Sequence, residues 1–364
     1  MAVPRGTFRV DALQNLLTDL CASPVAVDRL ERLEPWAVAR VRLRSASALP
    51  CSVVVKWIPD GQREARSAAW RLRNELAALQ FLTEDLGIDL APRVPLDQLL
   101  RRDGAEAHGD RLAAFARARG ALSAATSGRA ETYYARRAEL GPVDPAADRA
   151  GRLAPLRAGA IEHASSLGVP LGGRSAHELT SALDELAAPG PFLALSNGDT
   201  EANNILLHAS GPAEARLIDF EFAGYTHALT DAVCLYVPGP AWPAVGDPTT
   251  TGLADQYRRA LARGIPEAED DRRYGHGLAA ACVSWTLIRL RRFALLDTRP
   301  PGDHSRLQLI ATLETAAGTA QTCRTLPHLT SWIRRIAAVL RHRWPDADQD
   351  FADPTRFPPY RARH

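Results

Sequence analysis

Three residues with side-chain oxygens, Asp199, Asn204 and Asp219, lie next to short apolar runs in the middle of the chain. Asn204 comes five residues after Asp199, and Asp219 comes 20 residues after it. An amide oxygen and a carboxylate are ligands that suit Mg²⁺, which completes its shell with water or phosphate oxygens. A further carboxylate beside the metal can orient a hydroxyl and accept its proton. The alternative is that each residue serves a turn or a helix cap.

A second candidate is Lys56, the only lysine among 44 lysine and arginine residues. It lies inside the apolar run 52–57, an unusual place for a charge. A compact ammonium binds a phosphate as a point charge, a role that the planar guanidinium does not reproduce. Lys56 is therefore a candidate for phosphate contact, with chance placement of a rare residue as the alternative.

Glu75 lies in a helix predicted over 62–84. It falls on the helix side that faces inward, and a carboxylate there is costly unless it is paired. Lys56 on the preceding strand is the predicted partner. A surface pair with Arg71, four residues earlier, is the alternative. The apolar face of this helix is predicted to contain Ala65, Ala69, Leu72, Leu76 and Leu79.

The first hundred residues predict the elements that position these side chains: a helix, a small antiparallel sheet and a second helix. Apolar residues alternate with Arg40, Arg42 and Arg44, as in a strand with one buried face. The predicted elements are a helix over 8–21, strands over 25–27, 37–43 and 53–55, and the helix over 62–84.

Helical patterns dominate beyond about residue 100, which predicts an N-terminal lobe over 1–100, a C-terminal lobe over 101–345 and an irregular tail over 346–364. Short strand signals interrupt the helices at 192–195, 204–207 and 215–220. The predicted helices cover 109–126, 129–140, 146–167, 175–187, 251–263, 274–296, 304–323 and 328–342.

Composition excludes several classes of function. The formal net charge is +2 and no dense basic run occurs, so nucleic acid and membrane surfaces are not expected partners. Five scattered cysteines without a C-x-x-C pair, and no signal-peptide pattern, predict a cytoplasmic protein. The apolar stretch Leu278–Leu290 is too short to span a bilayer. The sequence contains no G-x-S-x-G, Walker A or G-x-G-x-x-G pattern.

At these residues the chain resembles the aminoglycoside phosphotransferase and choline kinase-like superfamily of small-molecule kinases, over roughly residues 25 to 300. Asp199 and Asn204 have the separation of the Asp and Asn in the kinase catalytic loop H-R-D-x-x-x-x-N. The resemblance implies an α+β, two-lobed protein-kinase-like fold, with a small antiparallel β lobe and a larger, mainly helical lobe.

The resemblance also implies a role for each candidate. Lys56, held by Glu75, would contact the α- and β-phosphates of ATP or GTP. Asp199 would be the catalytic base, and Asn204 and Asp219 would bind Mg²⁺. Asp231 matches an acidic residue that braces the catalytic loop, although it could equally be a helix cap.

Three departures from the pattern of this superfamily stand out. Asn197 replaces the usual histidine of His-Gly-Asp, so its amide is expected to support the loop. Asp219-Phe220-Glu221 replaces Asp-Phe-Gly and is closer to the choline kinase-like branch. No glycine lies between residues 6 and 61, so a Gly-rich phosphate cover is missing. The region around Trp36, or Ser45 and Ser47, would have to take its place.

Signals for the acceptor are weaker. Glu201, Glu221 and Asp247 are candidates for contact with a substrate, and the acidic run 267–271 would suit a polycationic acceptor. Negative charge at a helix N-terminus is the alternative for the acidic run. Five aromatic residues could line an acceptor pocket or belong to the core: Tyr133, Tyr134, Trp242, Trp285 and Trp332.

These patterns predict a phosphotransferase that moves the γ-phosphoryl group of ATP or GTP, with Mg²⁺, to a hydroxyl of a small molecule. The resemblance, and not the residue pattern, implies that the acceptor is an antibiotic or another natural product. The alternatives are a metabolite kinase for an amino alcohol or sugar, and a non-catalytic, pseudokinase-like nucleotide-binding protein. The sequence leaves the acceptor, the nucleotide and the oligomeric state open.

Overall fold

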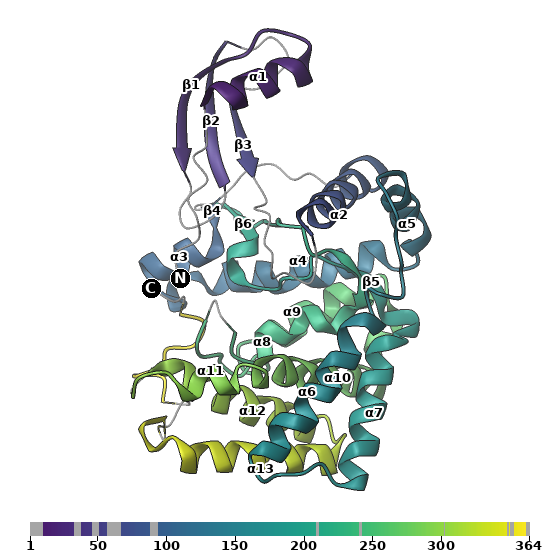
Figure 1. Ribbon diagram of the computed structural model, residues 1–364, viewed down its shortest axis with the longest axis vertical. Coiled ribbons are helices and arrows are strands. Elements are labelled where there is room, and N and C mark those ends of the chain that lie inside the picture. The colour runs from purple at the N-terminus through teal and green to yellow at the C-terminus, as the bar shows by residue number, and fades with distance from the viewer. Residues whose placement is uncertain are drawn as a thin grey trace. The chain divides into compact units, whose positions relative to one another are not determined.

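The computed structural model of the chain describes residues 10–32, 38–45, 51–56, 67–87, 94–208, 211–239, 242–301, 303–347, 349 and 353–361. They belong to two compact units, Met1–Leu72 and Arg73–His364, both drawn in Figure 1. The composition shift had placed the boundary near residue 100. The structure divides the chain earlier, after Leu72, because α2 (Ala68–Gln80) belongs to the larger unit from Arg73 onward. The predicted α+β class is confirmed.

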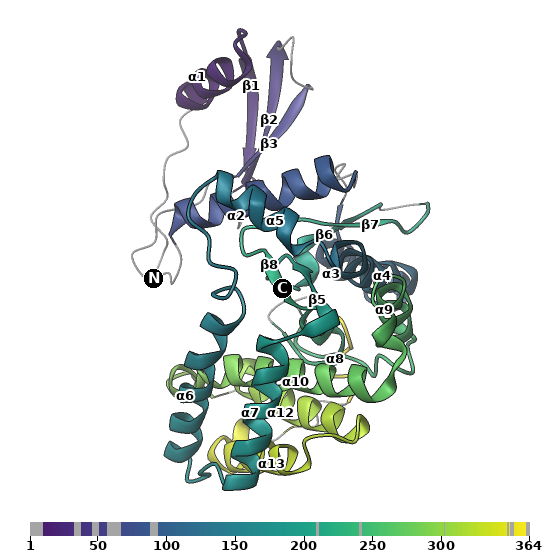
Figure 2. The ribbon, with the colours of Figure 1, turned by 90° about the vertical axis from the view of Figure 1, so that its right-hand side faces the viewer.

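The first unit contains a three-stranded antiparallel sheet with a helix on one face, as Figure 2 shows. The helix is α1 (Val10–Cys21), and the strands are β1 (Ala26–Arg32), β2 (Val38–Ser45) and β3 (Ser52–Lys56). The predicted alternation along β2 is confirmed, because Ala39, Val41 and Leu43 are buried and the arginines between them are exposed. Val41 pairs with Val53, so β3 is held in register and ends at Lys56.

The second unit is mainly helical, with two small antiparallel sheets ordered β4-β6-β7 and β5-β8. Its strands are β4 (Val94–Pro95), β5 (Leu193–Ser196), β6 (Ile205–Leu207), β7 (Ala215–Leu217) and β8 (Gly224–His227). After α2, its described α-helices are α3 (Leu96–Asp103), α4 (Gly109–Thr126), α5 (Ala130–Glu139), α6 (Ala150–Ser166), α7 (Gly173–Ala187), α8 (Val233–Tyr236), α9 (Leu253–Ala262), α10 (Asp271–Leu290), α11 (Phe293–Asp297), α12 (His304–Thr322) and α13 (Pro327–Arg343).

The core of this unit lies around α10, which packs against α6, α7 and α12. Figures 1 and 2 show α10, α12 and α13 stacked one below the other. The apolar stretch Leu278–Leu290 belongs to α10 and is buried there almost throughout. Among the described residues, no helix is long and apolar enough to cross a membrane.

Most helices predicted from the sequence are present, with three differences. The helix predicted over 274–296 is two helices, α10 and α11, because the chain turns at Arg291 and Arg292. The sequence did not predict α3, α8, β4 or β8, each of which is short, although Leu96, Leu99 and Leu100 of α3 have helical spacing. In the predicted tail, Tyr360 is 2% exposed and donates a hydrogen bond to the Leu235 carbonyl, so this described residue belongs to the core.

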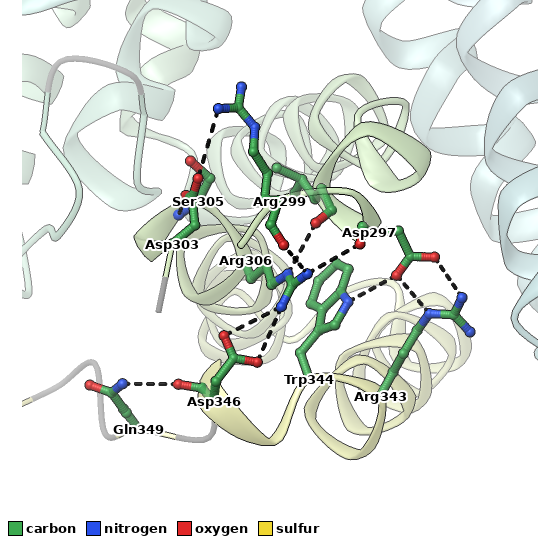
Figure 3. A network of polar contacts seen from close by, with 10 residues as sticks. Asp297, Arg299, Asp303, Ser305, Arg306, Arg343, Trp344, Asp346 and Gln349 are labelled. Atoms are coloured by element: carbon green, nitrogen blue, oxygen red, sulfur yellow. Dashed lines mark hydrogen bonds and ion pairs between the residues drawn. The ribbon is translucent and has the colours of Figure 1, made fainter. Parts of the chain in front are cut away.

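A buried arginine joins the helices near the C-terminal end, as Figure 3 shows. Arg306, at the start of α12, is 7% exposed and forms an ion pair with Asp346 at 3.2 Å. Its guanidinium also donates hydrogen bonds to the carbonyl oxygens of Leu296, Asp297 and Arg299. One side chain therefore fixes the segment after α11 against α12 and the tail.

We expect Arg306→Met to lower the free energy of unfolding by about 2–4 kcal/mol, because it leaves buried carbonyl groups and a carboxylate without their donor. Urea denaturation would measure this as a lower midpoint. Arg259→Met is the matched control, since Arg259 forms an exposed pair with Asp255 on α9 and should change the midpoint little. Equal midpoints for the two variants would contradict this role of Arg306.

Candidate active site

A buried arginine of α4 donates hydrogen bonds to the loop after β5. Arg119 is fully buried, and its Nη1 donates a hydrogen bond to Asn197 Oδ1 at 3.3 Å. Its Nη2 donates to the carbonyl oxygen of Glu201 at 3.4 Å, so one guanidinium contacts both ends of the loop. Asn197 Nδ2 in turn donates to the Ile218 carbonyl at 3.1 Å. Asn197, which stands where the resemblance predicted a histidine, thus connects the loop to the segment that carries Asp219.

Gly198 lets this loop turn tightly beside the segment after Asp219. It adopts φ of +77°, and a Cβ there would collide with the backbone carbonyl of Phe222. The Gly198 N–H donates to Ser196 Oγ at 2.9 Å, and Ser196 Oγ donates to Asp231 Oδ1 at 2.6 Å. Asp231 is 1% exposed. Its carboxylate therefore braces the loop through Ser196, in the place where a loop support was predicted.

The hairpin β6–β7 brings Asn204 next to the segment of Asp219. Ile205 pairs with Leu217, and Ile218 N–H donates to the Asn204 carbonyl at 3.0 Å, which extends the ladder by one bond. Asp219 follows directly and adopts φ of 64°, in the left-handed region that residues other than glycine rarely occupy. Such backbone strain is concentrated at functional sites.

Asp199 lies close to both residues. The Asn204 Nδ2 donates to the Asp199 carbonyl at 3.3 Å, and Glu201 N–H donates to Asp199 Oδ1 at 3.4 Å. Burial raises the pKa of the Asp199 carboxyl, the charge of Arg119 and these neighbours lower it, and the like charge of Asp219 raises it further. A carboxylate with a raised pKa is a better proton acceptor, because it binds the proton more tightly.

Three carboxylates meet at Asp219. Glu75, Asp219 and Glu221 each have one oxygen within 4.8 Å of the others, and all three side chains are half-buried. Carboxylate oxygens at this spacing are the donors that a hard divalent cation prefers. The donor set therefore fits a magnesium ion, with Asp219 as the shared residue. Glu221 and Glu75, which the sequence had assigned to the substrate and to Lys56, lie within reach of the same ion.

The predicted ion pair between Lys56 and Glu75 would join the two units, because Lys56 ends β3 in the first unit and Glu75 belongs to the second. It stays a prediction. The predicted inward face of the helix, however, is wrong: Leu72 is 59% and Leu76 is 42% exposed. The residues that α2 and the turn after it bury are instead Arg71, Asn74, Ala77, Ala78, Phe81 and Leu82.

Asn74 explains why this face turns inward. It is 1% exposed, and its Nδ2 donates hydrogen bonds to the backbone carbonyl groups of Phe220, Glu221 and Ala223. Its Oδ1 accepts a hydrogen bond from the hydroxyl of Tyr133 at 2.9 Å. One amide on α2 therefore fixes the backbone that directly follows Asp219. The small side chains of the two alanines beside it allow this close approach.

We expect Asn74→Asp to weaken metal-dependent activity by about 10- to 100-fold, as outer-sphere changes at metal sites do. The new oxygen would face the three carbonyl oxygens and displace the segment that carries Asp219. The apparent Mg²⁺ affinity in steady-state kinetics is the measurement, and it should fall more than the affinity for the acceptor. Tyr133→Phe is the control, since it removes the hydroxyl that donates to Asn74 and to the Ala223 carbonyl but leaves the Asn74 amide in place, and it should have a smaller effect.

A cavity of about 180 Å³ lies beside Asp199 in the second unit. Its walls come from the loop after β5, from β8 and the turn after it, and from α6, α7 and α10. Asp199 and Gly198 form part of its lining, so a molecule in the cavity would lie against the carboxylate with the raised pKa. This is where an acceptor hydroxyl could meet its base.

Two solved structures match the chain over most of its length. One is from Ralstonia eutropha JMP134 and is described as a "putative aminoglycoside phosphotransferase"; it is 13% identical, with 92% of this chain and 99% of that chain covered and a TM-score of 0.46. The other is the macrolide 2'-phosphotransferase MphH of Brachybacterium faecium, 17% identical, with 83% and 97% covered and a TM-score of 0.44. No protein-family model matches, and a search of curated protein sequences returns no significant match.

With identities this low and TM-scores below 0.5, the function of the chain has to be judged from its own residues. Two candidates for substrate contact lie apart from the cavity lining. Glu201 is 9% exposed and its carboxylate is directed toward Gly239. Asp247 is exposed and accepts a hydrogen bond from Thr249 N–H in the turn before α9. In the acidic run 267–271, Asp270 caps α10 by accepting hydrogen bonds from two backbone N–H groups. The helix-terminus alternative therefore applies to this residue.

Of the five aromatic candidates, Trp285 lines the cavity, whereas Tyr133, Trp242 and Trp332 are core residues with at most 1% exposure. Tyr134 donates a hydrogen bond to Asp148 Oδ2 at 2.8 Å. The Trp36 region and Ser47, considered for phosphate contact, lie outside the described residues, and Ser45 ends β2.

Sequence reasoning missed Arg119 and Asn74. Arg119 had a usable signal: it lies four residues after Phe115 and three before Leu122, on the apolar face of its helix. A charge on such a face requires acceptors, and a polar loop was the obvious source. Asn74 carried no comparable signal, since its partners are backbone carbonyl groups some 146 residues away.

Proposed function

We propose that the chain is a small-molecule kinase that transfers the γ-phosphoryl group of ATP or GTP, with Mg²⁺, to a hydroxyl. The observation that carries the proposal is that Asp199, after β5, lines a cavity and lies near Asn204, just before β6, and Asp219, just after β7. Phosphoryl transfer requires little covalent chemistry from the protein, so positioning and charge neutralisation supply most of the rate.

In this proposal Asp199 acts on the acceptor. Its carboxylate would orient the hydroxyl and accept the proton as the new oxygen–phosphorus bond forms. The bond between the γ-phosphorus and the bridging oxygen breaks at the same time, and the nucleoside diphosphate leaves. The burial that raises the pKa of Asp199 favours this proton transfer, because a stronger base accepts the proton more readily.

Asn204 and Asp219 would hold the magnesium ion, with Glu221 as a further donor. When bound, the ion would neutralise phosphate charge. Glu75 has two candidate partners, the ion and Lys56. The strained backbone at Asp219, together with the hydrogen bonds from Asn74, would keep the metal-binding carboxylate at a fixed position. The acceptor expected from the sequence is an antibiotic or another natural product.

Acceptor-dependent formation of nucleoside diphosphate tests the proposal. The purified chain is incubated with ATP or GTP and a panel of hydroxyl compounds, once with Mg²⁺ and once with excess EDTA. We expect turnover only with Mg²⁺, and turnover that depends on the acceptor. Tight nucleotide binding without turnover on any acceptor would favour the pseudokinase-like alternative.

A further inference from the structure

The cavity beside Asp199 has a largely apolar wall. Leu153 and Leu156 of α6, Leu186 of α7 and Trp285 of α10 line it. Ile288, one turn further along α10, also lines it and is 40% exposed, so the apolar wall reaches solvent. Apolar side chains at an open rim favour a ligand with an apolar face, because its burial removes both surfaces from water.

Two of the carboxylates that line the cavity are buried and already accept a hydrogen bond from the protein. Asp148 is 7% exposed and accepts the hydrogen bond from Tyr134. Asp231 is 1% exposed: its Oδ1 accepts the hydrogen bond from Ser196, and its Oδ2, which has no hydrogen-bond partner among the described residues, is buried. Burial also lowers the pKa of His227, which keeps this side chain neutral near pH 7.

The remaining charges do not favour a polycation. Arg149 lines the cavity and would repel one, whereas Asp199 is the carboxylate that meets the hydroxyl. The carboxylates considered from the sequence for a polycationic acceptor lie elsewhere, as Asp247 and the cap Asp270 illustrate. A ligand with several ammonium groups would lose their hydration here without gaining enough ion pairs.

The volume of the cavity limits the part of the acceptor that enters it. An engineered protein cavity of about 150 Å³ binds benzene, and this cavity measures about 180 Å³. Pockets that enclose a whole drug-sized ligand measure about 300–1,000 Å³. One ring with its hydroxyl therefore fits, and the rest of a larger acceptor would extend past Ile288.

We propose that this cavity binds the acceptor through one ring that has an apolar face, and that the acceptor is an uncharged or singly charged alcohol and not a polycation. The assignment rests on the proposed function for the transfer step, in which the hydroxyl of this ring gives its proton to Asp199 and takes the γ-phosphoryl group. Trp285 and Ile288 contact the apolar face of the ring and determine specificity.

Two acceptor sets test this assignment in the full-length chain with ATP and Mg²⁺. One set contains alkyl and aryl glycosides and sugar-bearing lactones, and the other contains polyamino cyclitol glycosides. We expect kcat/KM to be at least about tenfold higher for the first set. Ile288→Asp should raise the acceptor KM about tenfold and leave the KM for ATP unchanged. Leu295→Asp on α11 is the matched control, because Leu295 is 54% exposed and lies outside the cavity lining.

Binding measured without nucleotide separates this assignment from the proposed function. Saturation-transfer NMR with the same two sets should detect the apolar-faced alcohols on the wild-type chain and on Leu295→Asp, and lose them on Ile288→Asp. If they bind in this way but no phosphoryl transfer occurs, the binding site stands and the proposed function falls. Preferential binding or turnover of the polycations, or binding of neither set, would overturn the assignment.

Discussion

Asp199→Asn is expected to lower kcat by about 10²–10⁴-fold, the range that a general base contributes. Asparagine has the same shape and keeps an oxygen that can accept the Glu201 N–H, so the loop should retain its conformation. Its amide cannot accept the hydroxyl proton. Steady-state kinetics with a productive acceptor is the measurement, and the KM for the nucleotide should change little.

Asp247→Asn provides the control for this effect. It makes the same chemical change at an exposed turn residue and preserves the acceptor for Thr249 N–H. We expect wild-type activity from it. Transfer at the wild-type rate in Asp199→Asn would show that another group accepts the proton, and the role assigned to Asp199 would be wrong.

The second large effect is expected at the metal site. Asp219→Asn should reduce kcat/KM by about 10²–10³-fold and raise the Mg²⁺ concentration needed for half-maximal rate, because it removes one charge from the donor set. The left-handed backbone at this position should persist, since asparagine tolerates that conformation as well as aspartate. A magnesium titration of the initial rate measures both quantities.

Glu221→Gln is an informative comparison, because its oxygen lies within 4.8 Å of the Asp219 oxygen but its backbone has an ordinary conformation. A loss smaller than that of Asp219→Asn would agree with Asp219 as the shared ligand. An unaltered magnesium dependence in Asp219→Asn would show that Asp219 does not bind the metal ion.

The parts of the fold that follow from local periodicity could be predicted from the sequence. The alternation along β2 and the helices α7 and α13 are examples, since an apolar face must be buried in a core. The face that α2 buries could not be predicted, because it is determined by hydrogen bonds from Asn74 to distant carbonyl groups and not by apolarity.

The candidate site was predictable where side-chain type and spacing coincide. The separation of Asp199 and Asn204 singled them out, and β6 and β7 place Asn204 next to the Asp219 segment. The contribution of Arg119 and the cavity lining could not be predicted in the same way, because the lining combines residues from three distant helices. The candidate carboxylates for the acceptor were chosen by charge alone, and Glu201 and Asp247 proved to be a buried side chain and a turn residue.

The most direct test of the central claim is phosphorus-31 NMR of a reaction mixture that contains the chain, ATP or GTP, Mg²⁺ and an apolar-faced alcohol. The account predicts a new phosphomonoester signal that grows in step with the nucleoside diphosphate and is absent when Asp199→Asn replaces the wild-type chain. Formation of the diphosphate with inorganic phosphate alone, for every acceptor and with either nucleotide, would contradict it.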